Sequence, residues 1–410
     1  MVIIGILFFI FGFVTWLNGS LIPFLKVICN LTEFQSLFVT FAFYIAYTVM
    51  ALPMAYVLDK TGYKNGMAIG LGVMVVGSLL FIPAALSANF IYFLVALFTL
   101  GTGLTILQTA SNPYVVLIGP IESAAMRISI MGLINKSAGV LVPLLFTVLI
   151  FADMGSISGD LNNSEIEELS HRLIVPYIVM AVVLTALIAL VKFSSIPELE
   201  FEVDDTKGSI LEFPRLILGA IALFFYVGIE VIAGDTIGLY AQGLEVANAT
   251  ALTSYTMVFM VFGYLIGVFF IPKFLSQEKA LVFSSVGGML ILLGVAFSSS
   301  TSHGISDILW GWSGVVTLPN TVTFVALLGF ANALIWPTIW PLAIEGLGKY
   351  TAKGSAILIM SIAGGAIIPL VFGRIAQATG DMQLSYLVGI FCYGFILMYA
   401  RYWHKMTSWN

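Results

Sequence analysis

Twelve long apolar stretches dominate this sequence and limit what it can fold into. A helix needs about 20 apolar residues to cross the ~30 Å hydrocarbon core of a bilayer. The stretches lie at residues 2–25, 34–58, 66–86, 91–117, 128–151, 173–193, 215–243, 250–271, 279–298, 319–346, 354–376 and 383–403. Only 9% of the residues are charged, whereas soluble domains carry roughly 25%. Because lipid cannot hydrogen-bond the backbone, the sequence predicts an all-α integral membrane protein with 12 transmembrane helices.

A charged segment divides these stretches into two sets of six. The apolar runs stop between residues 194 and 214, and acidic side chains gather there. We therefore predict an N-terminal six-helix half at 1–193, a cytoplasmic linker at 194–214 and a C-terminal six-helix half at 215–410. This layout resembles that of the major facilitator transporters. The resemblance implies a fold that moves solute by rocking its two halves around a central site.

The positive residues predict the orientation of the chain in the membrane. With a cytoplasmic N-terminus, the inner loops carry twelve of the 16 Lys and Arg residues and the outer side carries three, while Lys136 falls inside a span. Lys and Arg favour the cytoplasmic side of a membrane. We therefore predict that both termini are cytoplasmic, in a monomeric, multi-pass protein of the bacterial inner (plasma) membrane.

The sequence carries no residue pattern typical of catalysis, metal binding or nucleic-acid binding. Its two cysteines are far apart, which argues against a disulfide framework and a structural metal site. The three histidines fall in expected loops or in the tail, so no catalytic constellation is evident. The net charge of −5 points to no nucleic-acid partner. We predict a protein that is not an enzyme and has no cofactor other than a coupling ion.

The loop after the second span, MAYVLDKTGYKNG at residues 54–66, resembles the signature loop of the major facilitator superfamily. Asp59, Lys60, Gly62 and Lys64 match the pattern, whereas an upstream glycine is replaced by Ala55. The resemblance implies a conformational gating loop in which Gly62 permits a tight reversal. A basic loop on the cytoplasmic side would also follow from the positive-inside rule alone, and this alternative stays open.

Residues 106–120, ILQTASNPYVVLIGP, resemble the fourth span of the fucose–galactose–glucose:cation symporter family. In that family an acid precedes TAANPF or a similar stretch. The matching residues here are Thr109, Ala110, Asn112, Pro113, Gly119 and Pro120. The first, fifth and tenth spans carry further matches, among them Leu17, Asn18, Pro23, Arg127, Asn135 and Gly139. The resemblance covers nearly the whole chain and implies cation-coupled symport of a sugar.

Two departures from the family pattern concern the acids that bind protons. Proton-coupled members carry one acid in the first span and one in the fourth. The corresponding positions here are Gly19 and Gln108, and neither side chain can titrate. The family's proton mechanism therefore cannot simply be transferred to this chain.

Three charged residues within the spans are the alternative coupling candidates. A charge at the bilayer centre costs roughly 2.5–3.5 kcal/mol on insertion scales, so Lys136, Glu230 and Asp235 should face a cavity or a partner. Glu230 is the first candidate, with Tyr226 one turn before it on the same face. Asp235 is turned about 140° away from Glu230. A structural ion pair between helices is the competing interpretation for Glu230 and for Lys136.

Loss of both acids favours Na⁺ over H⁺ as the coupling ion. Neutral oxygens of Asn18, Gln108 and Thr109 could bind Na⁺ together with Glu230 or Asp235. Pro113 cannot donate a hydrogen bond to the carbonyl of Thr109, so that oxygen is also available. A proton-coupled symporter for fucose or an N-acetylhexosamine remains the alternative.

Amide and aromatic residues within the spans predict a hexose site. Amides and carboxylates bracket sugar hydroxyls, and aromatic faces cover the apolar side of the ring. We expect a hexose such as glucose or galactose, bound by Gln108, Asn112, Asn135, Lys136, Glu230, Asn332, Trp16 and Trp336. Asn332, Trp336 and Trp340 are expected to form one stripe on the tenth span. A multidrug or lipid exporter of the same fold is the rival class, and the amide-rich fourth span argues against it.

Overall fold

The computed structural model describes residues 2–117, 124–151, 163–194, 210–271 and 274–409. Within these ranges the regular structure is helical throughout. Twelve segments of the described residues are long and apolar enough to cross a membrane, as the sequence predicts. The chain is therefore an all-helical, multi-pass membrane protein. Position 119 and the central part of the expected linker, 195–209, lie outside the described residues.

The first six spans form one group of helices. The long helices are α1 (Val2–Trp16), α2 (Asn18–Ile28), α4 (Phe38–Thr61), α5 (Tyr63–Ser87), α6 (Phe90–Leu117), α7 (Ala124–Phe151) and α9 (Ile174–Phe193). Two short helices, α3 (Glu33–Ser36) and α8 (Asn163–Arg172), connect them. Span one is not continuous, because α1 ends at Trp16 and α2 begins at Asn18.

The last six spans form a second group. Its helices are α10 (Pro214–Asp235), α11 (Ile237–Gly243), α12 (Thr253–Phe270), α13 (Gln277–Phe297), α14 (Gly304–Trp310), α15 (Asn320–Asn332), α16 (Ile335–Ile344), α17 (Thr351–Met360), α18 (Gly364–Thr379), α19 (Met382–Ser385) and α20 (Val388–Arg401). Spans seven, ten and eleven are interrupted, at Thr236, at 333–334 and by a 3₁₀ turn at Ser361–Ala363. The apolar stretches expected at 215–243, 319–346 and 354–376 each correspond to one candidate span and contain more than one helix.

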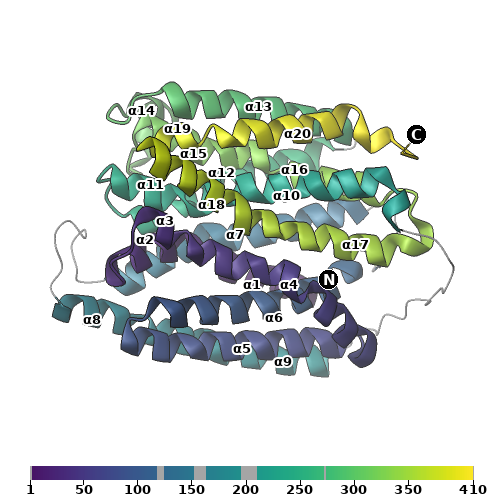
Figure 1. The fold of residues 1–410 in the computed structure, drawn as a ribbon, viewed down its shortest axis with the longest axis horizontal. Helices are drawn as coiled ribbons and strands as arrows, with labels where there is room; N and C mark the ends of the chain where they lie inside the picture. Colours follow the sequence, from purple (N-terminus) through teal and green to yellow (C-terminus); the bar gives the residue numbers. More distant parts are fainter. Residues whose placement is uncertain (1, 118–123, 152–162, 195–209, 272–273, 410) are drawn as a thin grey trace.

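The two groups lie side by side with their helices roughly parallel to one another (Figure 1). We call the end where α9 finishes and α10 begins the terminus side, because both chain termini lie there. The opposite end, which carries α3, α8, α14 and α19, is the distal side. The groups meet where α7 packs against α12 and α4 packs against α18.

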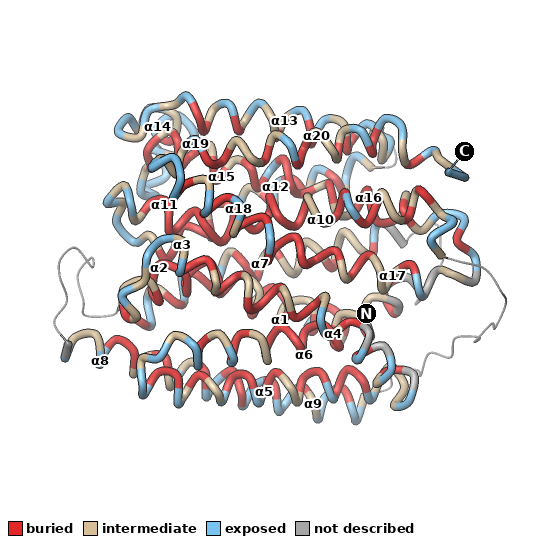
Figure 2. The backbone as a smooth tube through the Cα atoms, in the orientation of Figure 1, coloured by how far each residue is buried: buried red, intermediate tan, exposed pale blue. Residues whose placement is uncertain are grey.

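The spans differ strongly in how far they are buried. In the most apolar window of the span Pro214–Asp235, 72% of the residues are buried, compared with 33% for the span Ser164–Phe193. Buried residues line the middle of the molecule, and exposed residues follow α5, α9 and α13 at its edges (Figure 2). Helices at the edges present apolar side chains outward, as expected of surfaces that face lipid.

Polar contacts close the space between the groups on the distal side. The Ser20 hydroxyl donates to the carbonyl of Thr250 at 2.6 Å, and the Ser254 hydroxyl donates to the carbonyl of Val140 at 2.7 Å. The hydroxyl oxygens of Thr147 and Thr250 lie 2.8 Å apart. Each contact joins a helix of the first group to the second, so the distal side is sealed in this conformation.

Candidate functional site

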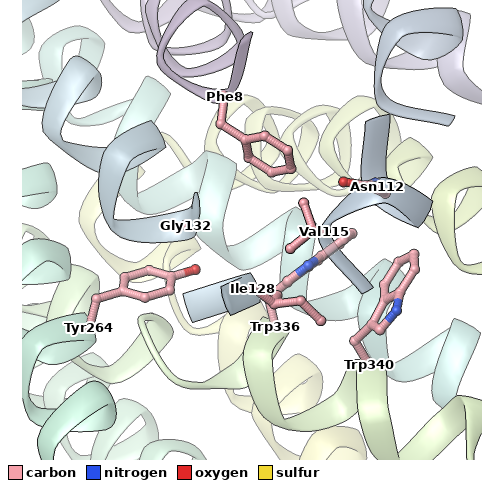
Figure 3. Close-up of a pocket in the computed structure, with 8 residues that line it drawn as sticks. All are labelled: Phe8, Asn112, Val115, Ile128, Gly132, Tyr264, Trp336 and Trp340. Carbon is pink, nitrogen blue, oxygen red and sulfur yellow. The ribbon is translucent and has the colours of Figure 1, made fainter. Parts of the chain in front are cut away.

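A cavity of about 120 Å³ lies between the two groups of helices. A smaller hollow of about 60 Å³ adjoins it and shares five of its residues (Figure 3). Val115, Ile128 and Trp340 line this hollow near the terminus-side ends of their helices. The main cavity is lined by Phe8, Phe11, Thr15, Trp16, Tyr44, Tyr47, Gln108, Asn112, Gly132, Asn135, Lys136, Tyr226, Val227, Glu230, Tyr264, Trp336 and Ile362. The cavity therefore draws residues from both groups and extends toward the terminus side.

The cavity collects seven of the eight residues expected to bind substrate. They are Trp16, Gln108, Asn112, Asn135, Lys136, Glu230 and Trp336. Asn332 is not among the lining residues; it is fully buried and accepts a hydrogen bond from Tyr393 at 2.7 Å. The physical reason is the break in span ten at 333–334, which ends α15 directly after Asn332. The stripe expected through Asn332, Trp336 and Trp340 is therefore wrong.

Lys136 and Glu230 form a buried ion pair across the two groups. The Lys136 Nζ lies 2.7 Å from Glu230 Oε1, and both side chains are at most one-tenth exposed. Tyr226, one turn earlier on α10, donates its hydroxyl to the same carboxylate oxygen at 2.6 Å. This pair links α7 of the first group to α10 of the second. Removing one partner would leave an uncompensated buried charge, which costs about 3–5 kcal/mol.

Trp16 lies flat against the cation of this pair. Its ring centre is 4.2 Å from Lys136 Nζ, a distance at which the ring face attracts a cation. Its indole Nε1 donates to Asn135 Oδ1 at 3.3 Å. A side chain at Gly139 or at Gly234 would meet this ring at 2.7 Å. Trp16 is therefore held between α7 and α10, beside the ion pair.

Span four supplies two amides to the cavity, as the sequence predicts. Gln108 Nε2 donates to the hydroxyl of Tyr47 at 2.9 Å. Asn112, one turn on, lines both the cavity and the smaller hollow. The helix α6 continues through position 113 to Leu117. Thr109 does not line the cavity, because its hydroxyl turns back to the carbonyl of Thr105 at 2.7 Å.

Aromatic rings cover the remaining walls. The rings of Trp336 and Trp340 stack with centroids 5.3 Å apart and rise from α16 toward Asn112 (Figure 3). Tyr264 points its hydroxyl into the same space (Figure 3). Tyr44, Tyr47 and Tyr264 were not expected from the sequence, because a tyrosine in an apolar helix also fits a core or an interfacial position. Only the fold distinguishes these possibilities.

Three of the five residues expected to bind a cation, Asn18, Thr109 and Asp235, lie outside the cavity lining. Asn18 is 1% exposed, and its Nδ2 has no hydrogen-bond partner among the described residues. Asp235 is fully buried and accepts a hydrogen bond from Tyr44 at 3.3 Å. Together with Thr109, these side chains face separate surroundings. The neutral oxygens expected to surround Na⁺ therefore do not meet in this conformation.

Position 19 has no room for a side chain. A Cβ atom on Gly19 would clash with the hydroxyl of Thr253 and would lie 3.1 Å from the carbonyl oxygen of Gly234. The Thr253 hydroxyl itself donates to that carbonyl at 2.7 Å. An acid at position 19 is therefore incompatible with this packing.

The loop expected to act in gating joins α4 to α5 on the terminus side. Gly62 has φ +78° and ψ 166°, a backbone conformation that glycine adopts readily. Lys60 is exposed and lies 4.4 Å from the centre of the Tyr56 ring. Lys64 donates to the carbonyl of Ser194 at 2.7 Å, and the Asp59 side chain lies outside the described residues. The loop makes the expected reversal, and its role in gating stays a prediction.

A sequence comparison identifies the family. The profile of the Major Facilitator Superfamily matches residues 4–369. The chain belongs to the major facilitator superfamily. Family membership and the named relatives make it a transporter rather than an enzyme, as the sequence predicts.

Named relatives extend over almost the whole transporter. A glucose/galactose transporter of Brucella abortus is 34% identical over 404 residues, covering 96% of this chain and 92% of the relative. The L-fucose-proton symporter of Escherichia coli is 28% identical over 425 residues, covering 98% and 92%. The crystal structure of the superfamily transporter FucP in its outward conformation matches with a TM-score of 0.75, 25% identity and coverage of 99% and 98%. The resemblance to the fucose–galactose–glucose family is thereby confirmed.

Proposed function

We propose that this transporter is a sugar–cation symporter that carries a hexose such as glucose or galactose by alternating access. The observation that carries the proposal is the cavity between the groups, where three amides and the Lys136–Glu230 pair meet aromatic rings. Relatives named glucose/galactose transporter and L-fucose-proton symporter support it.

The cavity offers both kinds of contact that a sugar ring requires. Gln108, Asn112 and Asn135 provide amide donors and acceptors for hydroxyl groups. Trp336 provides an apolar face for the C–H side of the ring. Lys136 can donate to a hydroxyl oxygen once its ammonium is free of Glu230. A proton on Glu230 thereby favours the contact between Lys136 and the sugar.

We propose a proton, carried on Glu230, as the coupling ion. Glu230 lines the cavity and is bonded to Lys136 and Tyr226 while it is ionised. A proton on the carboxylate removes its charge and frees the Lys136 ammonium, which the Trp16 ring still holds in the first group. The Na⁺ preference drawn from the sequence lacks support, since Asn18, Thr109 and Asp235 lie outside the cavity lining and one relative is named a proton symporter.

The sealed distal side is one of the two conformations that alternating access requires. With this side closed, sugar and proton exchange with the terminus side, and a rocking motion would open the distal contacts in turn. As part of this function we propose two six-helix halves at 1–193 and 215–410, joined by a linker at 194–214. We also propose that both termini are cytoplasmic and that the protein is a monomer in the bacterial inner membrane.

Uptake of labelled sugars into proteoliposomes tests this function. The purified protein is reconstituted and given D-glucose, D-galactose or L-fucose under an imposed pH gradient in Na⁺-free buffer, or under a Na⁺ gradient at equal pH. We expect the proton gradient to drive concentrative uptake of at least one hexose. A response to Na⁺ alone would contradict proton coupling, and no uptake of any hexose would contradict the sugar assignment.

Glu230→Gln separates coupling from binding in the same vesicles. The amide cannot titrate, so proton-driven accumulation should disappear, while exchange of labelled for unlabelled sugar continues. Asp307→Asn serves as the matched control, because Asp307 is an exposed acid on α14, outside the cavity. Persistent accumulation by Glu230→Gln would exclude Glu230 as the coupling group.

A further inference from the structure

A second buried acid, Asp235, has no role in the mechanism described so far. It is the last residue of α10 and is fully buried. Its Oδ1 has no hydrogen-bond partner among the described residues, and it forms no ion pair with them. Buried polar groups are normally satisfied, so an orphaned carboxylate oxygen calls for an explanation.

The other oxygen of this carboxylate contacts the opposite group of helices. Tyr44, on α4, donates its hydroxyl to Asp235 Oδ2 at 3.3 Å. Tyr44 lines the cavity, and its ring stacks against Tyr47, which accepts the hydrogen bond from Gln108. Asp235 therefore lies one side chain away from the cavity, behind its Tyr44 wall.

The neighbours of Asp235 place it at the sealed contact between the groups. The preceding residue, Gly234, packs against the Trp16 ring and against Gly19 of α2. Among the described residues, Tyr44 of α4, Lys136 of α7 and Glu230 of α10 itself interact electrostatically with Asp235. Lys136 is already bonded to Glu230, and none of the described Lys, Arg or His residues forms an ion pair with Asp235.

Because Asp235 is buried away from water, the free energy of the closed state depends on whether its carboxylate is charged. An ionised carboxylate without a partner is costly in a buried site, whereas a protonated one has no charge to desolvate. The contact with Tyr44 crosses the two groups, so it must break when they part on the distal side. In that open state the carboxylate would meet distal solvent.

We propose that Asp235 is a second protonation site of the transport cycle, loaded from the distal solution and linked to the cavity by Tyr44. The inference rests on the proposed function, because it requires proton-coupled transport. In the open state, a proton moves from hydronium to the Asp235 carboxylate and leaves water behind. The neutral acid is then buried when the distal side closes, and Tyr44 returns to it. Its proton leaves through the Tyr44 hydroxyl to water in the cavity on the terminus side, which restores the carboxylate.

The number of protons carried per sugar tests this proposal. Without a membrane potential, each coupled proton multiplies the accumulation ratio by about ten for every pH unit. With Glu230 and Asp235 both loaded, we expect a limit of about a hundredfold at a gradient of one unit. Asp235→Asn should lower this limit to about tenfold, whereas Asp307→Asn should leave it unchanged.

Sugar exchange without a gradient shows whether the variant is folded and binds. Asp235→Asn should keep this exchange, because neither sugar binding nor rocking requires the Asp235 charge. If Asp235→Asn does not fold, Asp235→Ser provides a smaller neutral side chain for the same measurement. Tyr44→Phe keeps both acids, so it should slow uptake without changing the accumulation limit.

The outcomes separate this inference from the function on which it rests. An unchanged hundredfold limit in Asp235→Asn would overturn the role of Asp235 and leave proton-coupled sugar transport in place. A wild-type protein that accumulates no sugar under a pH gradient would overturn the proposed coupling itself, and the second site with it.

Discussion

Single residues decide where charge can reside in this transporter. Gly19 and Gln108 occupy positions where proton-coupled relatives are expected to carry acids, and the charged groups are instead Lys136, Glu230 and Asp235. The Lys136–Glu230 bond of 2.7 Å links the two groups of helices. Trp16 covers the ammonium from the side. The chemistry of the cavity therefore depends on a cation from one group and an acid from the other.

The ion pair leads to a prediction about stability. Lys136→Met leaves the Glu230 carboxylate buried without its partner, and we expect a loss of about 3–5 kcal/mol. The double variant Lys136→Met/Glu230→Gln removes both charges and should recover most of that loss. Thermal unfolding in detergent measures both variants against the wild type. Equal destabilisation by the single and the double variant would contradict a charge-based explanation.

The packing of Gly19 leads to a second prediction at this scale. Gly19→Ala places a methyl group against the hydroxyl of Thr253, and overpacking of this kind costs about 1–3 kcal/mol. Gly287→Ala is the matched control, because a Cβ at Gly287 meets nothing within 4 Å. We expect a lower melting temperature for the first variant only. Equal melting temperatures would show that the space beside Gly19 adapts.

At the scale of elements, interrupted helices position the site. The break after Asn332 begins a new helix, α16, which carries Trp336 and Trp340 to the cavity and to the hollow beside it. The break after Trp16 similarly separates α1, which lines the cavity, from α2, which closes the distal side. The break in span one thereby separates a helix that lines the cavity from a helix that closes the distal side.

The two tryptophans of α16 should differ in their effect on binding. Trp336 lines both the cavity and the smaller hollow, whereas Trp340 lines only the hollow. We expect Trp336→Ala to weaken hexose binding about tenfold, in line with about 1.4 kcal/mol for a lost ring contact. Trp340→Ala should change affinity less. Titration calorimetry with the transported sugar measures both, and a larger effect at Trp340 would move the binding site toward the terminus side.

The helix breaks mark what the sequence could and could not predict. Twelve spans follow from apolar length, and polar residues in mid-span correctly pointed to a cavity at Gln108 and Glu230. The position of the Asn332 side chain outside the cavity could not be predicted, because its partner, Tyr393, lies on α20, far along the chain. The direction in which the Asn18 and Thr109 side chains point depends on a helix rotation of about 100° per residue. An error of one or two residues in the expected helix bounds therefore places a side chain on the wrong face.

At the scale of the whole molecule, the proposed alternating access requires the two groups to part on the distal side. The contacts that hold them there include the hydroxyl pair of Thr147 and Thr250, with oxygens 2.8 Å apart. They join α7 to the turn that precedes α12. A covalent bond at this place would prevent opening without touching the cavity.

A disulfide engineered at this contact should stop transport reversibly. In a background with both native cysteines changed to serine, Thr147→Cys/Thr250→Cys should lose sugar exchange on oxidation and regain it on reduction. Either single cysteine variant controls for effects of oxidation alone. A cross-linked protein, verified by gel mobility, that still exchanges sugar would show that the distal side need not open.

The closed space around Gly19 also limits how this protein can evolve. A single substitution of Gly19 cannot install an acid, because the Thr253 hydroxyl and the backbone of α10 fill the volume. Thr253 would first have to shrink, and the bond to the Gly234 carbonyl would then be lost. The substitution of Thr253 must therefore come before that of Gly19, and the protein that carries only the first substitution is less stable. We therefore expect descendants of this protein to keep both Gly19 and Thr253. The absence of an acid at position 19 would then be difficult to reverse.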